Sequence, residues 1–318
     1  MLLFVLKRSM ALFLSLLVAS VVIFVTMEAL PGDIATVVLG TGAREDTLAA
    51  FRTLHGLDRP YLERYVGWIG DLARGDLGQS YTYSVPVREL IADRLAISLP
   101  LALMGISLST LIAIPLGVLA AAHRGRLSDL LVMVFSQLGV AIPNFWFALL
   151  MILVFAVQLG WLSTGGFAGW ESGFWPGLSS LLMPAISLAL PQAAILARVT
   201  RSSMLETLGE DYIRTARAKG LSKKATLWRH ALRNALIPVV TIMGLQFSFL
   251  LAGTIIIENV FYLPGLGRLI FQAISNRDLI VVRNLVLLLA GTVIIVNFII
   301  DLLYLLLDPR LRQGRRYA

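Results

Sequence analysis

The side chains that could carry out acid-base or nucleophilic chemistry are few in this chain and lie far apart along it. The sequence has three histidines, His55, His123 and His230, and no cysteine. Without cysteine there is no thiol nucleophile, zinc thiolate or disulfide. Gly105-Ile106-Ser107 is superficially like a membrane serine site, but no histidine lies in the same apolar segment to activate Ser107. The sequence also lacks a His-Glu-x-x-His zinc motif. These observations argue against a hydrolase that works within a membrane.

Nucleotide hydrolysis by this chain is also excluded, because a phosphate-binding loop needs Gly-Lys-Ser or Gly-Lys-Thr. The dipeptide Gly-Lys occurs nowhere in the sequence. A channel is a weaker alternative, since it needs a selectivity filter or a ring of like charges and no apolar segment supplies either. We therefore expect no enzyme activity, no cofactor and no metal in this chain, and an energy source, if any, in another protein.

The composition is that of a membrane protein. A soluble domain has about 25% charged residues, whereas this chain has 14% charged and 58% hydrophobic residues and a mean hydropathy of +0.81. A helix needs about 20 apolar residues to cross a bilayer. Six uncharged stretches are long enough: residues 9–27, 95–122, 130–170, 178–197, 235–257 and 285–307, the last interrupted by Asp301. The sequence therefore predicts an all-α membrane protein with six transmembrane helices.

Two of these stretches need interpretation. We expect the third span to end near Gln158, because the glycines that follow, with Trp161 and Trp170, are typical of an interfacial loop. The first stretch could be a removable signal peptide. Its apolar run exceeds the 7 to 15 residues of a signal core and has no small-x-small cleavage site after it, so we expect the first helix to remain.

The distribution of Lys and Arg predicts the orientation, because cytoplasmic loops carry the excess of these residues. With the N-terminus inside, the inner segments hold 17 of the 27 Lys and Arg residues, and the outer segments hold 10 of them with 13 acidic residues. Both termini are then cytoplasmic. The net charge of +8 could indicate a nucleic-acid partner. The excess Lys and Arg residues lie in the inner segments, however, where membrane topology alone explains them. We therefore expect no nucleic-acid partner.

The first outer loop, residues 30–94, is too long for a simple hairpin. Pro60 suits the first turn of a helix, Gly75 suits a C-terminal cap, and the apolar residues Leu62, Tyr65, Ile69 and Leu72 recur at helical spacing. The sequence predicts a small helical cap on the outer face.

The inner loop, residues 198–234, has two apolar stripes: Leu205, Leu208, Tyr212 and Ala216, then Leu221, Ala225, Trp228 and Leu232. Between the stripes, Gly220 can end one helix and Ser222 can cap the next. The pattern predicts a helix, a turn and a second helix with a basic outer surface. From the residues alone, this pair could lie on anionic lipid or present its turn to a groove on a cytoplasmic partner.

Two segments of this loop, residues 211–221 and 227–238, resemble the cytoplasmic signature loop of permease subunits in binding-protein-dependent ABC importers. They are most similar to the dipeptide, oligopeptide and nickel branch. Motifs along the whole chain resemble the first permease of that branch, by their order and spacing: Leu30-Pro31-Gly32-Asp33, Gly56-Leu57-Asp58-Arg59-Pro60, Arg74-Gly75-Asp76-Leu77-Gly78, Pro264-Gly265-Leu266-Gly267-Arg268, Asn276-Arg277-Asp278 and Leu307-Asp308-Pro309-Arg310. The sequence departs from the family pattern at Arg214-Thr215-Ala216, where the general motif has Glu-Ala-Ala.

The resemblance implies a type I ABC importer permease fold in the bacterial cytoplasmic (inner) membrane. It implies a second homologous permease, two ATPases that bind ATP and Mg, and an extracytoplasmic substrate-binding protein. The cargo would be di- or oligopeptides, or alternatively nickel, glutathione or another small solute. The turn around Gly220 would enter a groove on the ATPase. The coupling residues would be Arg214, Ala216, Arg217, Lys219, Gly220, Leu221, Ser222 and Lys223.

We divide the chain into an N-terminal helix (1–29), an outer helical cap (30–94), a permease core (95–307) that includes the inner loop, and a cytoplasmic tail (308–318). Four polar residues in the spans are candidates for the substrate pathway: Asn144, Gln192, Gln246 and Asp301. Structural roles compete in each case. Prolines near the first two commonly only kink a helix, Gln246 could bond to another helix, and Asp301 could reach water or a cytoplasmic basic group.

Overall fold

A computed structural model of the chain describes residues 2–29, 32–40 and 42–307. Five of its helices are long and apolar enough to cross a membrane: α1 (Leu2–Glu28), α5 (Val87–Ala122), α8 (Phe174–Leu208), α11 (Leu232–Val260) and α13 (Leu279–Leu307). No strand is present in the described ranges. The all-α prediction is confirmed. The predicted tail, residues 308–318, and part of the Leu30-Pro31-Gly32-Asp33 motif lie outside the described residues.

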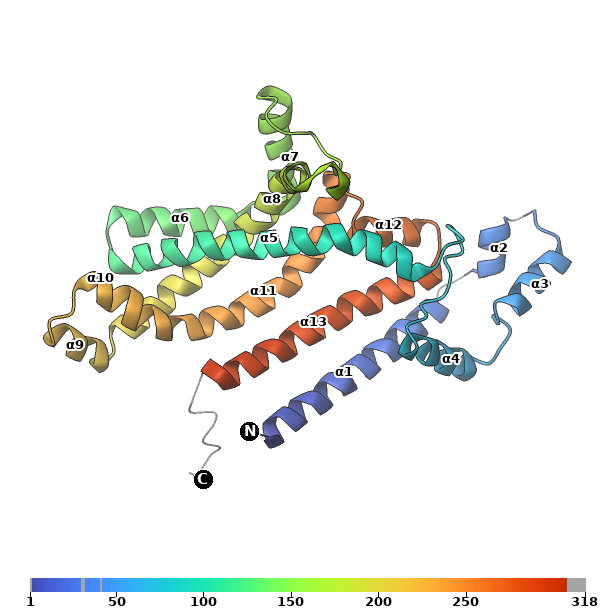
Figure 1. Cartoon of the computed structure of the whole chain (residues 1–318), viewed down its shortest axis with the longest axis horizontal. Coiled ribbons are helices and arrows are strands. Elements are labelled where there is room, and N and C mark those ends of the chain that lie inside the picture. The colour runs from blue at the N-terminus through green and yellow to red at the C-terminus, as the bar shows by residue number, and fades with distance from the viewer. Residues whose placement is uncertain (1, 30–31, 41, 308–318) are drawn as a thin grey trace.

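The third predicted span is not a straight helix. It consists of α6 (Leu127–Ala141), α7 (Asn144–Met151) and a π-helical turn (Ile152–Gln158), with a bend of 100° at Pro143. Proline lacks the N–H group of a helical turn and clashes with the carbonyl four residues earlier, so the helix ends at Ala141. Figure 1 shows α7 projecting away from the bundle. A span is broken here, although its end at Gln158 is where the sequence predicts it.

The predicted outer cap is helical, with α2 (Ile34–Leu39), α3 (Glu45–Leu54) and α4 (Tyr61–Ala73). Pro60 precedes α4 as its N-cap, and Gly75 follows it with a φ of +80°. One side of α4 packs against α1. Trp68 of α4 and Phe24 of α1 are buried there, and around them lie Tyr65, Ile69 and Leu72. Leu62 is exposed instead, so only part of the predicted apolar stripe faces the bundle.

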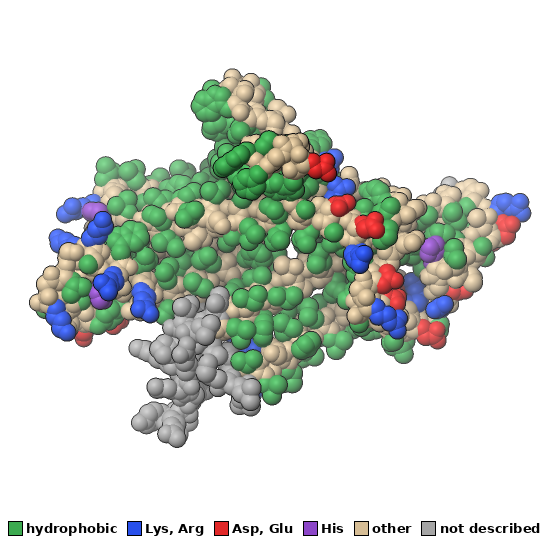
Figure 2. Space-filling model, viewed as in Figure 1, with side chains coloured by type: hydrophobic (Ala, Val, Ile, Leu, Met, Phe, Trp, Pro, Cys, Tyr) green, Lys and Arg blue, Asp and Glu red, His purple; other side chains and the backbone are tan. Residues whose placement is uncertain are grey.

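The cap and the inner loop lie at opposite ends of the molecule. Figure 1 shows α2, α3 and α4 at one end, and α9 (Asp211–Ala218) and α10 (Lys223–Ala225) at the other. Helix α1 begins and helix α13 ends toward the side of α9 and α10. Figure 2 shows basic side chains at the α9 end, mixed charges at the cap end, and an apolar surface between them. This distribution of charge is the one expected of a protein that spans a membrane.

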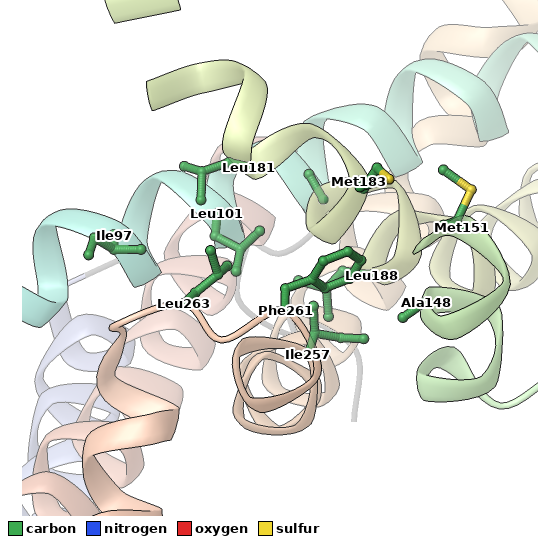
Figure 3. Close-up of a cluster of buried hydrophobic side chains, with 11 residues drawn as sticks. Ile97, Leu101, Ala148, Met151, Leu181, Met183, Leu188, Ile257, Phe261 and Leu263 are labelled. Atoms are coloured by element: carbon green, nitrogen blue, oxygen red, sulfur yellow. The ribbon is translucent and has the colours of Figure 1, made fainter. Parts of the chain in front are cut away.

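The core is built on the contact between α5 and α8, the most extensive helix pair in the described residues. Leu101 of α5, Leu181 and Leu188 of α8, and Ile257 of α11 meet in one buried cluster (Figure 3). Phe261, just after α11, completes this cluster. The Gly-rich segment after Gln158 folds over the same region, where the Trp170 indole N–H donates to the Ala96 carbonyl at 2.9 Å.

Candidate functional site

The turn between α9 and α10 has the local geometry that its residue types require. We call residues 219–222 the elbow. Gly220 has a φ of +82°, and a Cβ atom placed there would meet no atom within 4 Å. Glycine adopts this left-handed conformation without the steric cost that other residues incur. Ser222 Oγ accepts a hydrogen bond from the Ala225 amide at 3.2 Å and so caps the next helix. Both local predictions are confirmed.

The elbow region is attached to the core by some of the predicted stripe residues, Leu205, Leu208 and Leu232, and by one that the sequence did not indicate. Ile213 is fully buried, against Val118 of α5 and Met204 of α8. Tyr212 and Trp228, assigned to the apolar stripes, are 40% and 46% exposed. The first stripe was wrong at Tyr212, because the chain breaks at Gly209 and Glu210 and the residues before and after the break belong to separate helices. A π-helical turn over Thr226–Ala231 changes the helical phase of the second stripe.

The outer surface of the elbow is basic and exposed. Arg217, Lys219 and Lys223 are exposed, as are the carboxylate of Asp211 and its partner Arg214. The Arg214 guanidinium lies 3.2 Å from Asp211, one helical turn away. Leu221 and Ala216 are only half-buried. The structure therefore brings all eight predicted coupling residues onto one projecting turn, with apolar atoms at its apex and cations around them.

The elbow lies at the end of a single long helix. The residues Lys223–Val260 form one continuous helix of 38 residues, comprising α10, the π-helical turn and α11. The sequence had predicted a separate amphipathic helix followed by a span. At about 1.5 Å per residue, a helix of this length reaches across a membrane. A displacement of its inner end can therefore pass to the opposite face along one continuous helix, which includes the π-helical turn and Pro238.

Beside the elbow, an ion pair that the sequence did not reveal joins α6 to α8. The Arg201 guanidinium donates to both carboxylate oxygens of Asp129, at 2.5 and 2.9 Å. The Gly125 amide donates to the same carboxylate at 2.9 Å. In the sequence Arg201 is only one of the basic residues of the inner loop, because nothing local to it indicates a partner 72 positions away. This pair links the α5–α6 turn to the helix that leads into α9.

Near the C-terminal end of α11, a buried carboxylate lies against the first turn of the short helix α12 (Leu266–Ser275). Glu258 accepts hydrogen bonds from the Gly267 amide at 2.6 Å and the Arg268 amide at 3.2 Å. A Cβ at Gly265 or Gly267 would overlap this carboxylate. The Pro264-Gly265-Leu266-Gly267-Arg268 motif therefore lets Glu258 approach the amides of the first turn of α12. The two glycines of this motif are visible in the sequence, but nothing in the sequence indicates that Glu258 is the residue they make room for.

The pathway candidates do not form one group. Gln246 and Gln192 come together, since the Gln246 side-chain amide donates to the Gln192 carbonyl at 3.3 Å, and the side-chain oxygens of both are buried without a hydrogen-bond partner among the described residues. Asn144 lies at the start of α7, close to Gly253 of α11. Asp301 lies elsewhere, 2.9 Å from Arg8 of α1. Arg8 is a basic residue near the N-terminal end of α1, so this contact fits the structural alternative in which Asp301 reaches a basic group.

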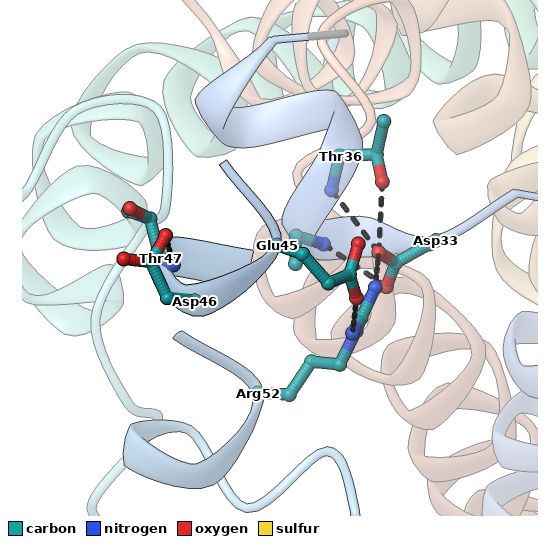
Figure 4. Close-up of polar contacts among 7 residues, drawn as sticks. Asp33, Thr36, Glu45, Asp46, Thr47 and Arg52 are labelled. Carbon is teal, nitrogen blue, oxygen red and sulfur yellow. Dashed lines mark hydrogen bonds and ion pairs between the residues drawn. The ribbon is translucent and has the colours of Figure 1, made fainter. Parts of the chain in front are cut away.

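The cap is held by polar contacts around Asp33. Its carboxylate accepts hydrogen bonds from the Thr36 hydroxyl at 2.8 Å and the Arg52 guanidinium at 2.8 Å, and Glu45 also contacts Arg52 (Figure 4). The hydrogen bond from Arg52 is the main reason that the pKa of Asp33 is lowered to about 2, and partial burial opposes it. No cluster of three or more His, Asp or Glu side chains suited to a metal ion occurs in the described part of the chain.

Comparison with known proteins decides the family. Residues 113–313 match the family described as binding-protein-dependent transport system inner membrane component, and residues 1–102 match its N-terminal membrane component. The chain belongs to this family. It is a multi-pass membrane subunit of a binding-protein-dependent transport system. The resemblance found in the elbow motifs is thereby confirmed over nearly the full length of the chain.

Individual relatives agree with the family. A provisionally named peptide transport system permease protein of Brucella abortus (strain 2308) is 42% identical over 308 residues, which cover 97% of this chain and 98% of the relative. The glutathione transport system permease protein GsiC of Escherichia coli O6:H1 is 38% identical over 312 residues, which cover 98% and 99% of the two chains.

Among solved structures, a chain of the inward-facing MetNI methionine ABC transporter aligns with a TM-score of 0.56 at 19% identity. The alignment covers 69% of this chain and 96% of that chain. At this identity the likeness concerns the fold alone, and it agrees with the type I importer permease fold.

Proposed function

We propose that this chain is a permease subunit of an ABC importer that moves di- or oligopeptides across the bacterial cytoplasmic membrane. Both of its termini face the cytoplasm. It pairs with a second homologous permease, two ATP-binding cassette subunits act on it from the cytoplasm, and a substrate-binding protein delivers cargo to the outer face. The chain itself does no chemistry, and ATP and Mg are bound by the ATPase subunits.

One observation carries the proposal: the elbow is the inner end of a continuous 38-residue helix. Its tip has a half-buried Leu221 and a small Gly220 within a basic rim, which suits insertion into a groove with acidic edges. Ile213 fixes the elbow to α5 and α8, so a pull on the elbow is transmitted to the bundle without loss in a flexible linker. Glu258, near the other end of this helix, moves the first turn of α12 with it.

The peptide cargo is supported by the names of relatives. The Brucella abortus relative is named for peptide transport, and GsiC is named for glutathione transport. Glutathione is itself a tripeptide, and it is the second candidate cargo. Transport of tri-alanine by membrane vesicles with the cognate binding protein, in competition with glutathione and with Ni²⁺, distinguishes peptide, glutathione and nickel import.

Replacement of Gly220 by Trp tests the coupling role. Because the left-handed φ disfavours a side chain and the indole would block a groove, we expect normal insertion, weaker ATPase association and loss of transport. Gly125 is a matched control, since it has a φ of +77°, is exposed on the same side and has no atom within 4 Å of an added Cβ. Gly125→Trp should retain transport. Undiminished transport by Gly220→Trp would contradict the proposal.

A further inference from the structure

A cavity of about 340 Å³ lies between the cap and the outer ends of α1 and α13. Its walls come from the end of α1, the start of α2, the end of α3 and the segment after it, helix α4, the loop that contains Tyr81, and the first turns of α13. Arg283, Trp68, Tyr81, Arg64, Glu28 and Gly67 are among its lining residues. The cavity is distinct from the elbow and from the pathway candidates, and the coupling mechanism makes no use of it.

Arg283 lines this cavity without a direct ion pair among the described residues. Its Nε atom is buried without a hydrogen-bond partner, and no carboxylate among the described residues lies within 4 Å of its guanidinium. Glu28, the carboxylate on the same wall, is fully engaged by Arg64, with oxygen-nitrogen distances of 2.7 and 2.8 Å. Glu28 and Asp71 attract the Arg283 charge only from a distance, so no carboxylate of the described residues is in direct contact with this arginine.

The orientation of Arg283 is fixed by the residues around it. Its guanidinium carbon lies 4.5 Å from the centre of the Trp68 ring, in a cation-π contact. The Trp68 indole N–H donates to the Asn284 side-chain oxygen at 3.2 Å, and the Asn284 amide donates to the Leu77 carbonyl at 2.8 Å. Arg283 is half-buried, and a cation held partly out of water with no carboxylate in contact is costly to the protein alone. The same arrangement is favourable for binding an anion, since little side-chain entropy is lost on binding.

We propose that this cavity binds the oxyanion of a small ligand, with Arg283 as the main donor. Arginine forms paired hydrogen bonds to carboxylate and phosphate groups, so the ligand chemistry is a terminal carboxylate of a short peptide or the phosphate of a lipid headgroup. Glu63 and Asp71 also line the cavity but are exposed, where water screens their repulsion of an anion. Binding of a peptide carboxylate here would rest on the proposed peptide cargo, whereas binding of a lipid phosphate would not, and neither involves the elbow.

The test uses the full chain in nanodiscs of phosphatidylcholine. Calorimetric titration with tri-alanine and with its C-terminal amide measures carboxylate binding. Native mass spectrometry of nanodiscs that also contain phosphatidylglycerol measures retention of the anionic lipid. We expect saturable binding from one of these sources, and Arg283→Gln should weaken it by about tenfold or more, as expected for hydrogen bonds to a charged group.

Two further variants make the outcome decisive. Gly67→Phe retains Arg283 but adds a ring at a cavity-lining position where a Cβ meets no atom within 4 Å. The ring should also block binding. If Arg283→Gln does not fold, this variant alone tests whether the ligand binds in the cavity. Arg44→Gln, on the exposed start of α3, should bind like the unaltered protein. The proposal is overturned if neither tri-alanine nor phosphatidylglycerol binds, or if both cavity variants bind with unchanged affinity.

Discussion

Ser98 of α5 donates its hydroxyl to the carboxylate of Glu258 of α11 at 2.5 Å, across 160 positions of sequence. The same hydroxyl oxygen accepts the Leu266 amide at 2.8 Å. The two residues thereby connect three helices at the outer face: α5, α11 and the start of α12. Because α11 continues to the elbow, this connection lies at the far end of the helix that the ATPases are proposed to move.

Ser98→Ala should destabilise the protein. The substitution leaves the Leu266 amide without its acceptor and removes a donor from the Glu258 carboxylate, and an unsatisfied buried group of this kind costs about 1–3 kcal/mol. Thermal unfolding in a mild detergent measures the loss. Ser107→Ala, at an exposed position of the same helix, is the control and should have little effect. Equal unfolding temperatures for the two variants would show that the Ser98 contact contributes nothing.

Gly117→Ala should weaken the central helix pair. A Cβ at Gly117 would lie 2.5 Å from the Thr200 Cβ and 2.8 Å from the Ala197 carbonyl oxygen, so α5 and α8 would have to separate. Overpacking of this type costs about 1–3 kcal/mol. Gly70→Ala in α4, where a Cβ meets no atom within 4 Å, should be neutral or stabilising. Comparable yields of folded protein for both variants would rule out close packing at Gly117.

Asp301→Asn should leave transport largely intact. Asp301 is paired with Arg8 at 2.9 Å, and the two side chains are 28% and 46% exposed. The side-chain oxygen of Asn can still accept a hydrogen bond from the Arg8 guanidinium, so the variant should lose only a little stability. A double-mutant cycle with Arg8→Gln measures the coupling. Abolished transport with normal stability would instead place Asp301 on the substrate pathway.

The cap should loosen at strongly acidic pH. The pKa of Asp33 is about 2 in the folded protein against an ordinary value of 3.8, so its contribution to stability is present above about pH 4 and is lost as the pH falls toward 2. Hydrogen exchange of the α2 and α3 amides, corrected for intrinsic rates, should accelerate over this range. Asp33→Asn should abolish this pH dependence. If the dependence persists in that variant, another group is responsible.

The sequence alone determined the features that depend on neighbouring residues. Hydropathy identified the apolar helices, since each span must be apolar along its own length. The left-handed Gly220 and the Ser222 cap followed from the conformations that these residue types prefer. The charge on the inner loop predicted which end is basic. The order of the motifs predicted the family, which the comparisons confirmed.

Tertiary structure decided everything that depends on residues distant in sequence. Nothing near Glu258 indicates that Ser98 and the amides after Gly265 satisfy its carboxylate, and nothing near Arg201 indicates Asp129. The 100° bend at Pro143 was visible only as an interruption, because a proline breaks the local hydrogen bonds while packing sets the angle. Ile213 is buried and Tyr212 is exposed because the helix breaks at Gly209 and Glu210, and α9 therefore turns a different face toward the core. Local preference determines where a helix can form, but the partner of a buried charge or apolar face is determined by which helices pack together.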